Sequence, residues 1–235
     1  EDKVSLRRRL QAFGYTTDEL RKIITPMVTT ANEAVGAMGD DTPLAVLSDR
    51  PKLLYNYFRQ LFAQTNPPID AIREKIVTSS KTAIGRMGDI LNPGPNTAHQ
   101  IVLENPIISN EDMNRLRNLN YNGFTSVTIP MLYRIQDDGK GLEEALQTIF
   151  ERAAEQIRKG VNIIILSDRG INSQMAPIPS LLAVSALHHY LVKEELRTQA
   201  SIVVESGDAR NPHHFALLIG YGATVVNPYL AIDAV

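Results

Sequence analysis

The sequence predicts an α/β fold: a parallel β-sheet built from βα units, as an open sheet or a partial barrel, preceded by a mainly helical N-terminal region. From about residue 121 onward, short apolar runs alternate with longer segments whose apolar residues recur every three or four positions. Such alternation of buried strands and amphipathic helices is typical of a parallel sheet that is covered on both faces. The helical spacing dominates before that point, so we expect one portion at 1–120 and a second at 121–235.

The N-terminal portion contains three segments with a helical pattern. Residues 16–39 open with Thr-Thr-Asp, a typical helix start, and Pro26 is expected to kink this helix. In residues 51–66, leucines and aromatic residues form an apolar stripe behind an initial proline, and residues 69–80 predict a shorter helix. Frequent glycine and proline in residues 85–122 predict irregular structure there.

The C-terminal portion predicts strands and helices in strict alternation. The strands are expected at 124–130, 161–169, 200–208 and 223–229. The helices between them are expected at 141–160, 179–197 and 211–222. Because parallel strands place their carboxyl ends along one edge of the sheet, the residues that follow the strands should meet at one rim.

Polar residues follow these strands directly. One apolar run leads straight into Ser167-Asp168-Arg169, and a shorter one, "LAVL", leads into Ser48-Asp49-Arg50. Asp49 and Arg50 join the same rim if the shorter run is a further strand. The candidate rim residues are Asp49, Arg50, Asp168, Arg169, Glu205, Asp208, Arg210 and Asn227.

The residue types of the rim allow two chemical interpretations. The acids could transfer protons or hold a divalent cation, with Arg169 and Arg210 as clamps for an anion. Alternatively, the Ser and Asp residues end strands and cap the following helices, while Arg169 pairs with a neighbouring carboxylate or a facing domain. No spacing of a nucleophile and a base decides between them, so residue chemistry alone names no reaction.

Four of the five histidines stand in two adjacent pairs, His188-His189 and His213-His214. Adjacent residues on a helix point about 100° apart, so neither pair can hold one metal ion with both rings. We expect one ring of each pair to pack in the interior and the other to form a hydrogen bond or meet solvent. No metal ligand is assigned from these pairs.

Charge and cysteine content narrow the function classes. A formal charge of -2 and a pI near 6.2 provide no broad basic field, so neither nucleic acid nor a membrane is an expected partner. With no apolar run of membrane-spanning length and no leader at its start, the protein is expected to be soluble and cytoplasmic. The absence of cysteine excludes thiolate nucleophiles and cysteine-bound iron–sulfur clusters within the chain. Its abrupt ends suggest a piece of a longer protein.

Four long stretches of the sequence resemble the central domain of glutamate synthase. They are "LSDRPKLLYNYFRQLFAQTNPPIDAIRE", "NIIILSDRGI", "APIPSLLAVSALHHYLV" and "SIVVESGDARNPHHFALLIGYGATVVNPYLA". The stretches stand in the matching order, and the similarity runs over most of the chain. The chain is thereby identified as similar to one excised central domain of a multidomain enzyme.

This resemblance implies an oxidoreductase that makes L-glutamate from L-glutamine and 2-oxoglutarate. In the family, an amidotransferase domain with an amino-terminal cysteine hydrolyses glutamine, and ammonia passes through a tunnel to a domain with FMN and an iron–sulfur cluster. Electrons come from ferredoxin or from NAD(P)H through a partner subunit, and a plant member would lie in the plastid stroma. Since those cysteines are missing here, no catalytic, cofactor-binding or metal-binding residue of the family can be placed on this chain.

A central domain of this kind is expected to be inactive by itself, to link the amidotransferase and FMN-binding domains, and to help form the ammonia path. The rim then gains a third interpretation, as a surface that contacts the flanking domains, because such contacts are more polar than obligate interfaces. The alternative is a self-contained α/β enzyme or metal-binding domain that uses Asp168, Glu205 and Asp208 with a histidine.

Overall fold

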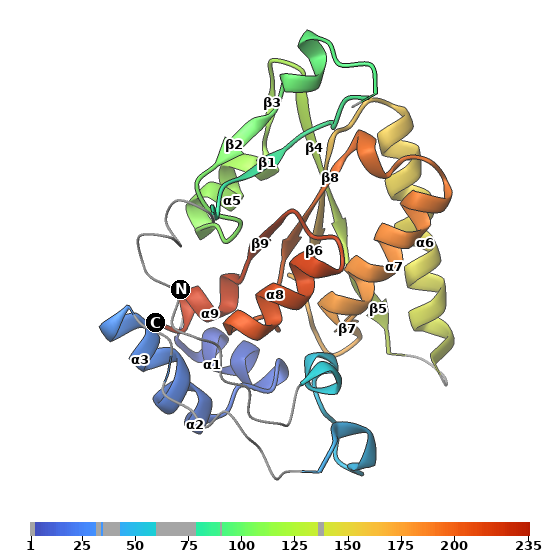
Figure 1. The fold of residues 1–235 in the computed structure, drawn as a ribbon. Helices are drawn as coiled ribbons and strands as arrows, with labels where there is room; N and C mark the ends of the chain where they lie inside the picture. The colour runs from blue at the N-terminus through green and yellow to red at the C-terminus, as the bar shows by residue number, and fades with distance from the viewer. Residues whose placement is uncertain (1–2, 32–33, 35–42, 60–78, 90, 136–138) are drawn as a thin grey trace.

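A five-stranded sheet with strand order β3-β4-β6-β8-β9 runs through the centre of the computed structural model (Figure 1). The structure describes residues 3–31, 34, 43–59, 79–89, 91–135 and 139–235. The strands of the sheet are β3 (Asn120–Tyr121), β4 (Phe124–Pro130), β6 (Ile163–Ser167), β8 (Ser201–Glu205) and β9 (Val225–Asn227). β3 is antiparallel to β4, whereas β4, β6, β8 and β9 are mutually parallel. The predicted α/β class is confirmed, and the strands of the described residues form an open sheet and no closed barrel.

Three helices cover one face of the sheet. They are α6 (Lys140–Arg158), α7 (Ser180–Lys193) and α8 (Pro212–Gly220), drawn from yellow to red in Figure 1. Successive residues of a strand point to opposite faces, so Ile164 and Leu166 of β6 pack with these helices while Ile163 and Ile165 point away. All five residues of β6 and of β8 are buried. This burial on both faces is the reason why these strands are mostly apolar.

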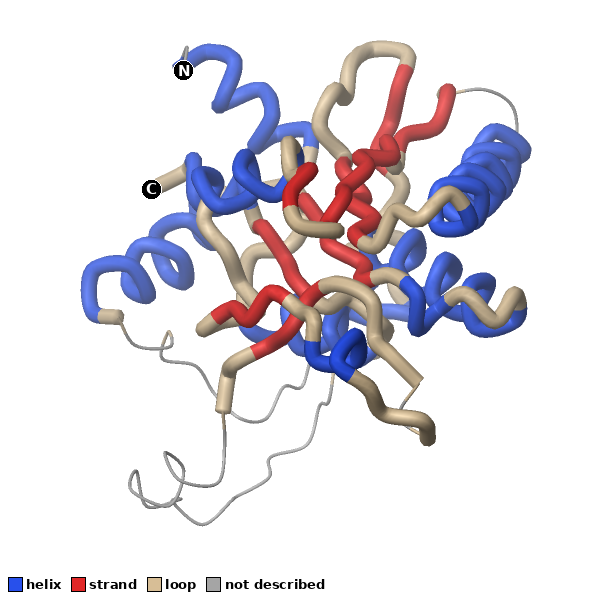
Figure 2. Tube along the Cα trace, turned by 90° about the horizontal axis from the view of Figure 1, so that it is seen from above, coloured by secondary structure: helices blue, strands red, loops and turns tan. Residues whose placement is uncertain are grey.

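The opposite face is covered by the middle of the chain. The antiparallel pair β1 (Thr82–Ile84) and β2 (Ile101–Leu103) lies there with α5 (Asn110–Arg117), and the short helix η4 (Pro95–Ala98) stands between the two strands in the chain. Ile84, Met113 and Leu116 from these elements form a core with Ile163 and Val203 of the sheet. Figure 2 shows the strands in the centre with helices on both sides. Both portions of the chain therefore contribute to one layered core, and the division at residue 120 stays a prediction.

The first residues of the chain lie against its last helix. The elements are α1 (Lys3–Ala12), α2 (Thr17–Glu19), η1 (Leu20–Ile24) and α3 (Thr25–Thr30), with α9 (Tyr229–Asp233) at the C-terminal end. Phe13, Tyr15 and Ile24 form a small third core with Tyr229 and Leu230. This core closes the edge of the sheet at which the parallel strands end, as the blue and red ribbons of Figure 1 show.

The predicted strands and helices after residue 121 are all present. Two short strands, β5 (Leu132–Arg134) and β7 (Met175–Pro177), form an additional antiparallel pair, and a 3₁₀ helix, η6 (Arg197–Gln199), precedes β8. The helix predicted at 16–39 is confirmed over 17–30, and a π-helical turn, η1, ends just before Thr25-Pro26. In the part of the chain that the structure describes, no helix is long and apolar enough to cross a membrane.

Three expectations for the N-terminal portion are wrong. The irregular structure expected over 85–122 is interrupted by β2, α5 and β3, because Ser109 caps α5 and the apolar side chains of this helix pack on the sheet. The run at 44–47 is not a strand but the 3₁₀ helix η2 (Ala45–Leu47). Over its described part, 51–59, the helix expected at 51–66 is replaced by the 3₁₀ helix η3 (Leu54–Phe58), and the backbone is extended at Arg59. Residues 60–66, and nearly all of the helix predicted at 69–80, lie outside the described residues. Packing decides the difference, because η3 turns Tyr55 into the core at the carboxyl ends of the strands.

Candidate functional site at the carboxyl ends of the parallel strands

The last residues of the four parallel strands lie side by side. In the register of the sheet, Ser167 pairs with Pro130 on one side and with Glu205 on the other, and Glu205 pairs with Asn227. Ser167, Glu205 and Asn227 are all buried. The predicted gathering of polar residues at one rim is therefore confirmed.

Glu205 is the centre of a charged cluster. Its Oε1 accepts hydrogen bonds from Nη2 of Arg117 and Nε of Arg169, each at 2.5 Å, and its Oε2 accepts one from the Ser167 hydroxyl at 2.6 Å. The Arg169 guanidinium also lies over the Tyr229 ring, 3.9 Å from the ring centre. Glu205 is 1% exposed, whereas both arginine side chains are 33% exposed. The buried charge is thus neutralised by two cations that reach the surface.

Asp168 is a second buried acid of the rim. Its Oδ2 accepts the N–H of Gly207 at 2.7 Å, while its Oδ1 has no hydrogen-bond partner among the described residues. Burial raises the pKa of the Asp168 carboxyl well above its usual range, and the Asp208 carboxylate raises it further, against the effect of the Gly207 bond. Burial, followed by the charge of Asp168, also raises the pKa of the Tyr229 hydroxyl. The folded chain therefore favours the protonated form of both groups.

Asp208 connects the rim to helix α7. Its Oδ1 accepts hydrogen bonds from the hydroxyls of Tyr55, at 2.9 Å, and Ser206, at 2.6 Å. Its Oδ2 accepts the N–H of Ser180, the first residue of α7, at 3.1 Å. A carboxylate at this place satisfies a free amide and matches the positive end of the helix dipole. The capping interpretation holds for Asp208, although the capped helix precedes its strand instead of following it.

Arg210 holds the N-terminal segment on the rim. Its guanidinium donates to the carbonyl oxygens of Phe13 and Gly14, at 3.0 and 3.3 Å, and to both carboxylate oxygens of Glu19. It also lies over the ring of Tyr15, 4.3 Å from the ring centre. With its side chain 5% exposed, Arg210 is fully committed to this contact and is not available as a clamp for a bound anion.

Asn227 fastens the edge of the sheet to the segment before α5. Its side-chain amide donates to the carbonyl oxygen of Ile108 at 3.0 Å and to the side chain of Asn110 at 2.9 Å. Asn110 in turn donates to Asp233 at 2.8 Å. Asn227 therefore joins β9, α5 and α9 in one partly buried hydrogen-bond network.

The backbone after β8 offers no free cradle for a phosphate. The five successive N–H groups of 206–210 all donate within the chain, in order to the Asn227 carbonyl, the Asp168 carboxyl, the Ser206 hydroxyl twice, and the His214 ring. Phosphate-binding loops need several such groups pointing together at the ligand. The N–H groups of this loop therefore stabilise its own conformation.

Asp49 and Arg50 do not belong to the rim cluster. They are exposed, and the polar contact that the structure gives this turn is the bond from the Arg50 N–H to the Ser48 hydroxyl at 3.2 Å. The expectation was wrong because the run before them is the 3₁₀ helix η2 and not a strand of the sheet. The two Ser-Asp-Arg triplets therefore have the same sequence but different structural environments.

Sequence reasoning also missed important partners of the rim. Arg117 supplies one of the two cations on Glu205, and Tyr55 supplies the hydroxyl on Asp208. The helix that carries Arg117 could have been predicted, since Ser109 and Asp112 form a cap at its start, but its contact with Glu205 could not. No comparable signal points from Tyr55 to a partner that follows 153 positions later.

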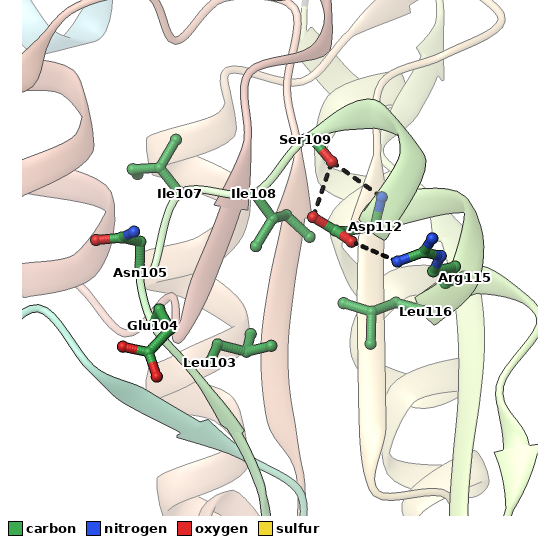
Figure 3. A pocket seen from close by; sticks show the side chains of 9 residues that line it. All are labelled: Leu103, Glu104, Asn105, Ile107, Ile108, Ser109, Asp112, Arg115 and Leu116. Atoms are coloured by element: carbon green, nitrogen blue, oxygen red, sulfur yellow. Dashed lines mark hydrogen bonds and ion pairs between the residues drawn. The ribbon is translucent and has the colours of Figure 1, made fainter.

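A shallow pocket of about 340 Å³ lies beside α5 (Figure 3). One of its lining residues, Ile108, accepts a hydrogen bond from Asn227. Three of its polar side chains are engaged with one another: the Ser109 hydroxyl donates to Asp112 at 2.8 Å, and Nη1 of Arg115 donates to the same carboxylate at 3.2 Å. These contacts close the first turn of a helix. The other acid that lines the pocket, Glu104, pairs with Lys81 at 3.1 Å.

The pair His213-His214 behaves as expected, whereas in the pair His188-His189 neither ring is fully buried. The His214 ring is buried and stacks on Tyr55 with 4.1 Å between ring centres, while His213 contacts the Tyr55 carbonyl oxygen at 3.2 Å. In the other pair, His188 accepts a hydrogen bond from Arg197 at 2.9 Å and His189 is exposed. Among the described residues, no group of three His, Asp or Glu side chains could hold a metal ion.

We predict that His214 makes the stability of the fold depend on pH. Burial, assisted by the nearby charges of Arg210 and His213, lowers the pKa of His214 from 6.5 to about 3. Below pH 6.5 His214 therefore takes up a proton in the unfolded chain but stays neutral in the folded chain. The free energy of unfolding should fall by about 1.4 kcal/mol per pH unit as the pH drops from 6.5 towards 4.5.

Urea denaturation of the wild type and of His214→Phe over this pH range measures the effect. The phenylalanine ring keeps the stacking on Tyr55 but cannot take up a proton, so the variant should lose less stability on acidification. His189→Phe, at an exposed position of α7, is the control and should follow the wild type. Parallel pH curves for His214→Phe and the wild type would contradict the prediction.

The geometry of the rim is that of a structural joint. Glu205 and Asp208 are saturated with donors, and Asp168 is buried beneath Gly207 and the ring of Phe13. None of these three acids is placed to exchange a proton with a bound substrate. Proton transfer and metal binding at the rim are therefore not favoured.

A comparison with known protein families assigns the chain. The family described as "Glutamate synthase central domain" matches residues 8–235. The chain belongs to the glutamate synthase central domain family. The resemblance seen in the sequence alone is thereby confirmed.

Curated relatives of this central domain are named as large chains or whole glutamate synthases. The chain is 49% identical over 224 residues to the glutamate synthase [NADPH] large chain of Bacillus subtilis, covering 95% of this chain and 14% of the relative. It is 42% identical to the glutamate synthase [NADH] of Schizosaccharomyces pombe, covering 97% and 11%. It is 39% identical to the ferredoxin-dependent glutamate synthase of Pyropia yezoensis, covering 99% and 15%. The central domain thus spans about a seventh or less of the relatives it matches.

Proposed function

We propose that this chain is the noncatalytic central domain of a glutamate synthase, where it links the glutaminase (amidotransferase) domain to the FMN-containing synthase domain. In this role it helps to form the path along which ammonia passes from glutamine to 2-oxoglutarate. A rigid link keeps the two active sites at a fixed separation, and an enclosed path keeps ammonia from escaping into water.

The observation that carries this proposal is the family match over nearly the whole chain together with the closure of its polar rim. The match supports the parent enzyme. The closure supports the noncatalytic role, because the rim acids are paired or buried and Arg210 is occupied by the N-terminal segment. A self-contained enzyme or metal-binding domain would need these groups to be accessible.

We propose further that FMN and the iron–sulfur cluster of the parent enzyme are held outside this chain. The chain contains no cysteine to ligate a cluster. The N–H groups of 206–210 already donate within the chain, one of them to the Asp168 carboxyl. They leave no free donors for a phosphate, so the rim does not fit FMN. The partners of the domain would be the flanking amidotransferase and FMN-binding domains of its own polypeptide, with ferredoxin or an NAD(P)H-oxidising subunit as the electron donor.

Assays on the full-length polypeptide and on the 235-residue chain test the proposal. With glutamine, 2-oxoglutarate and either reduced ferredoxin or NAD(P)H with its oxidising subunit, the full-length polypeptide should form glutamate. The 235-residue chain alone should form none, and titration calorimetry should detect no binding of glutamine or 2-oxoglutarate to it. Glutamate released by the chain alone would overturn the noncatalytic role, and a full-length polypeptide inactive with both reductants would overturn the assignment of the parent.

A further inference from the structure

A basic groove of about 610 Å³ lies between α1 and the loop that follows β6. The helix lines it with four residues spaced as one face of a helix, and the loop lines it with three consecutive residues: Ser5, Arg8, Arg9, Ala12, Ile171, Asn172 and Ser173. The groove adjoins the rim, because Ile171 packs against the core that contains Phe13 and Tyr229. We call it the α1 groove.

The α1 groove concentrates positive charge on a chain whose charges otherwise balance. The chain has 24 basic and 26 acidic residues, yet α1 carries Lys3 and the run Arg7 to Arg9 with no acid. No acid lines the groove among the described residues. Arg9 approaches Asp233 of α9 at 3.8 Å, while the side chain of Arg8 is exposed and makes no hydrogen bond or ion pair with the described residues. One further cation, Arg169, stands two positions before the groove loop and is one-third exposed.

We propose that the α1 groove binds an acidic stretch of the polypeptide that flanks this chain in the full-length protein. Guanidinium groups bind carboxylates through paired, charge-assisted hydrogen bonds, and the exposed hydroxyls of Ser5 and Ser173 can donate to the same stretch. The inference rests on the proposed function, which requires flanking domains to be seated on this one. The relatives supply the room for such a stretch, since the matched region is 11 to 15% of their length.

The position of the groove fits this partner. Ile171, which lines the groove, packs against the third core. The Arg210 contacts hold that core against the rim, so a stretch bound there would rest on a fixed surface. Contacts between domains of one chain are commonly polar, and the linked partner is present at a high effective concentration. Individually modest ion pairs therefore suffice to hold it.

Zero-length crosslinking of the full-length protein tests the inference. The variant Arg8→Lys places an amine in the groove that a carbodiimide joins to any carboxylate in contact with it. Peptide mapping by mass spectrometry should then find position 8 joined to Asp or Glu residues outside this chain. Arg7→Lys is the matched control, since Arg7 is exposed on the same helix but does not line the groove. The groove position should give about tenfold more crosslinked peptide than the control.

A mixture of isotopically light and heavy protein distinguishes the possible partners. Crosslinks within one polypeptide support the proposal, whereas light-to-heavy crosslinks would mean that a second copy fills the groove and would overturn it. Crosslinks that reach only Asp233, or equal yields at positions 7 and 8, would overturn it as well. Glutamate formation by the same variants is measured in parallel. Activity without the crosslink would refute the groove alone, and inactivity of the unmodified full-length protein would refute the proposed function.

Discussion

Replacing Glu205 by alanine is expected to lower the free energy of unfolding by about 3 kcal/mol. The change leaves the cations of Arg117 and Arg169 side by side without the carboxylate that accepts from both, and it removes the acceptor of the Ser167 hydroxyl. The loss should lie at the lower end of the range for breaking a buried ion pair, because both guanidiniums are one-third exposed and can turn to water. Urea denaturation of the wild-type chain and the variant measures it.

Two further variants identify the source of this loss. Glu205→Gln keeps the size and one acceptor but removes the charge, so it should recover only part of the stability. Glu104→Ala removes an acid whose side chain is 77% exposed and pairs with Lys81 at the surface, and it should cost less than about 1 kcal/mol. Equal losses for Glu205→Ala and Glu104→Ala would show that the buried cluster does not stabilise the fold.

Replacing Arg210 by alanine is expected to destabilise the chain by about 3 to 4 kcal/mol and to free its N-terminal segment. The variant loses the pair with Glu19 and the donors to the Phe13 and Gly14 carbonyl oxygens. It also removes the cation over the Tyr15 ring. Limited proteolysis should therefore cut near residues 13–16 faster in the variant than in the wild type, and denaturation should show the loss of stability.

A second substitution at position 210 separates the effect of the guanidinium geometry from the effect of the positive charge. Arg210→Lys keeps the charge but cannot address two carbonyl oxygens and a carboxylate together, so it should fall between alanine and the wild type. The surface control is Arg115→Ala, which removes a 71% exposed cation paired within its own helix and should cost less than about 1 kcal/mol. Unchanged proteolysis near residues 13–16 in Arg210→Ala would contradict the proposed anchoring role.

The fold of the C-terminal portion could be predicted because its pattern is local. β6 and β8 are buried on both faces and are therefore mostly apolar, and the amphipathic α6 ends just before Gly160, whose φ of 98° favours glycine. The N-terminal portion was harder. The apolar stripe at 51–66 resembles a helix, yet η3 spans only 54–58, because Tyr55 packs into the interior and bonds to Asp208.

The candidate site could be predicted in its position but not in its partners. Strand ends fix where Asp168, Glu205 and Asn227 lie, and the register of the sheet places them together as expected. The expectation failed for Asp49 and Arg50, since an identical Ser-Asp-Arg triplet says nothing about whether a strand precedes it. Direct contact of the exposed rim arginines with flanking domains stays a prediction.

By itself the sequence determined the α/β class, the order of strands and helices, the position of the rim and the family. Each of these depends on residues that are close together in the sequence or on long continuous stretches of it. Only the tertiary structure decided that the rim is closed. Its covering groups come from distant parts of the chain, with Glu19 lying 191 positions before Arg210 and Tyr55 lying 153 before Asp208. Contacts over such separations leave no periodic pattern in the sequence, since they depend on how whole elements pack and not on the spacing of neighbouring residues.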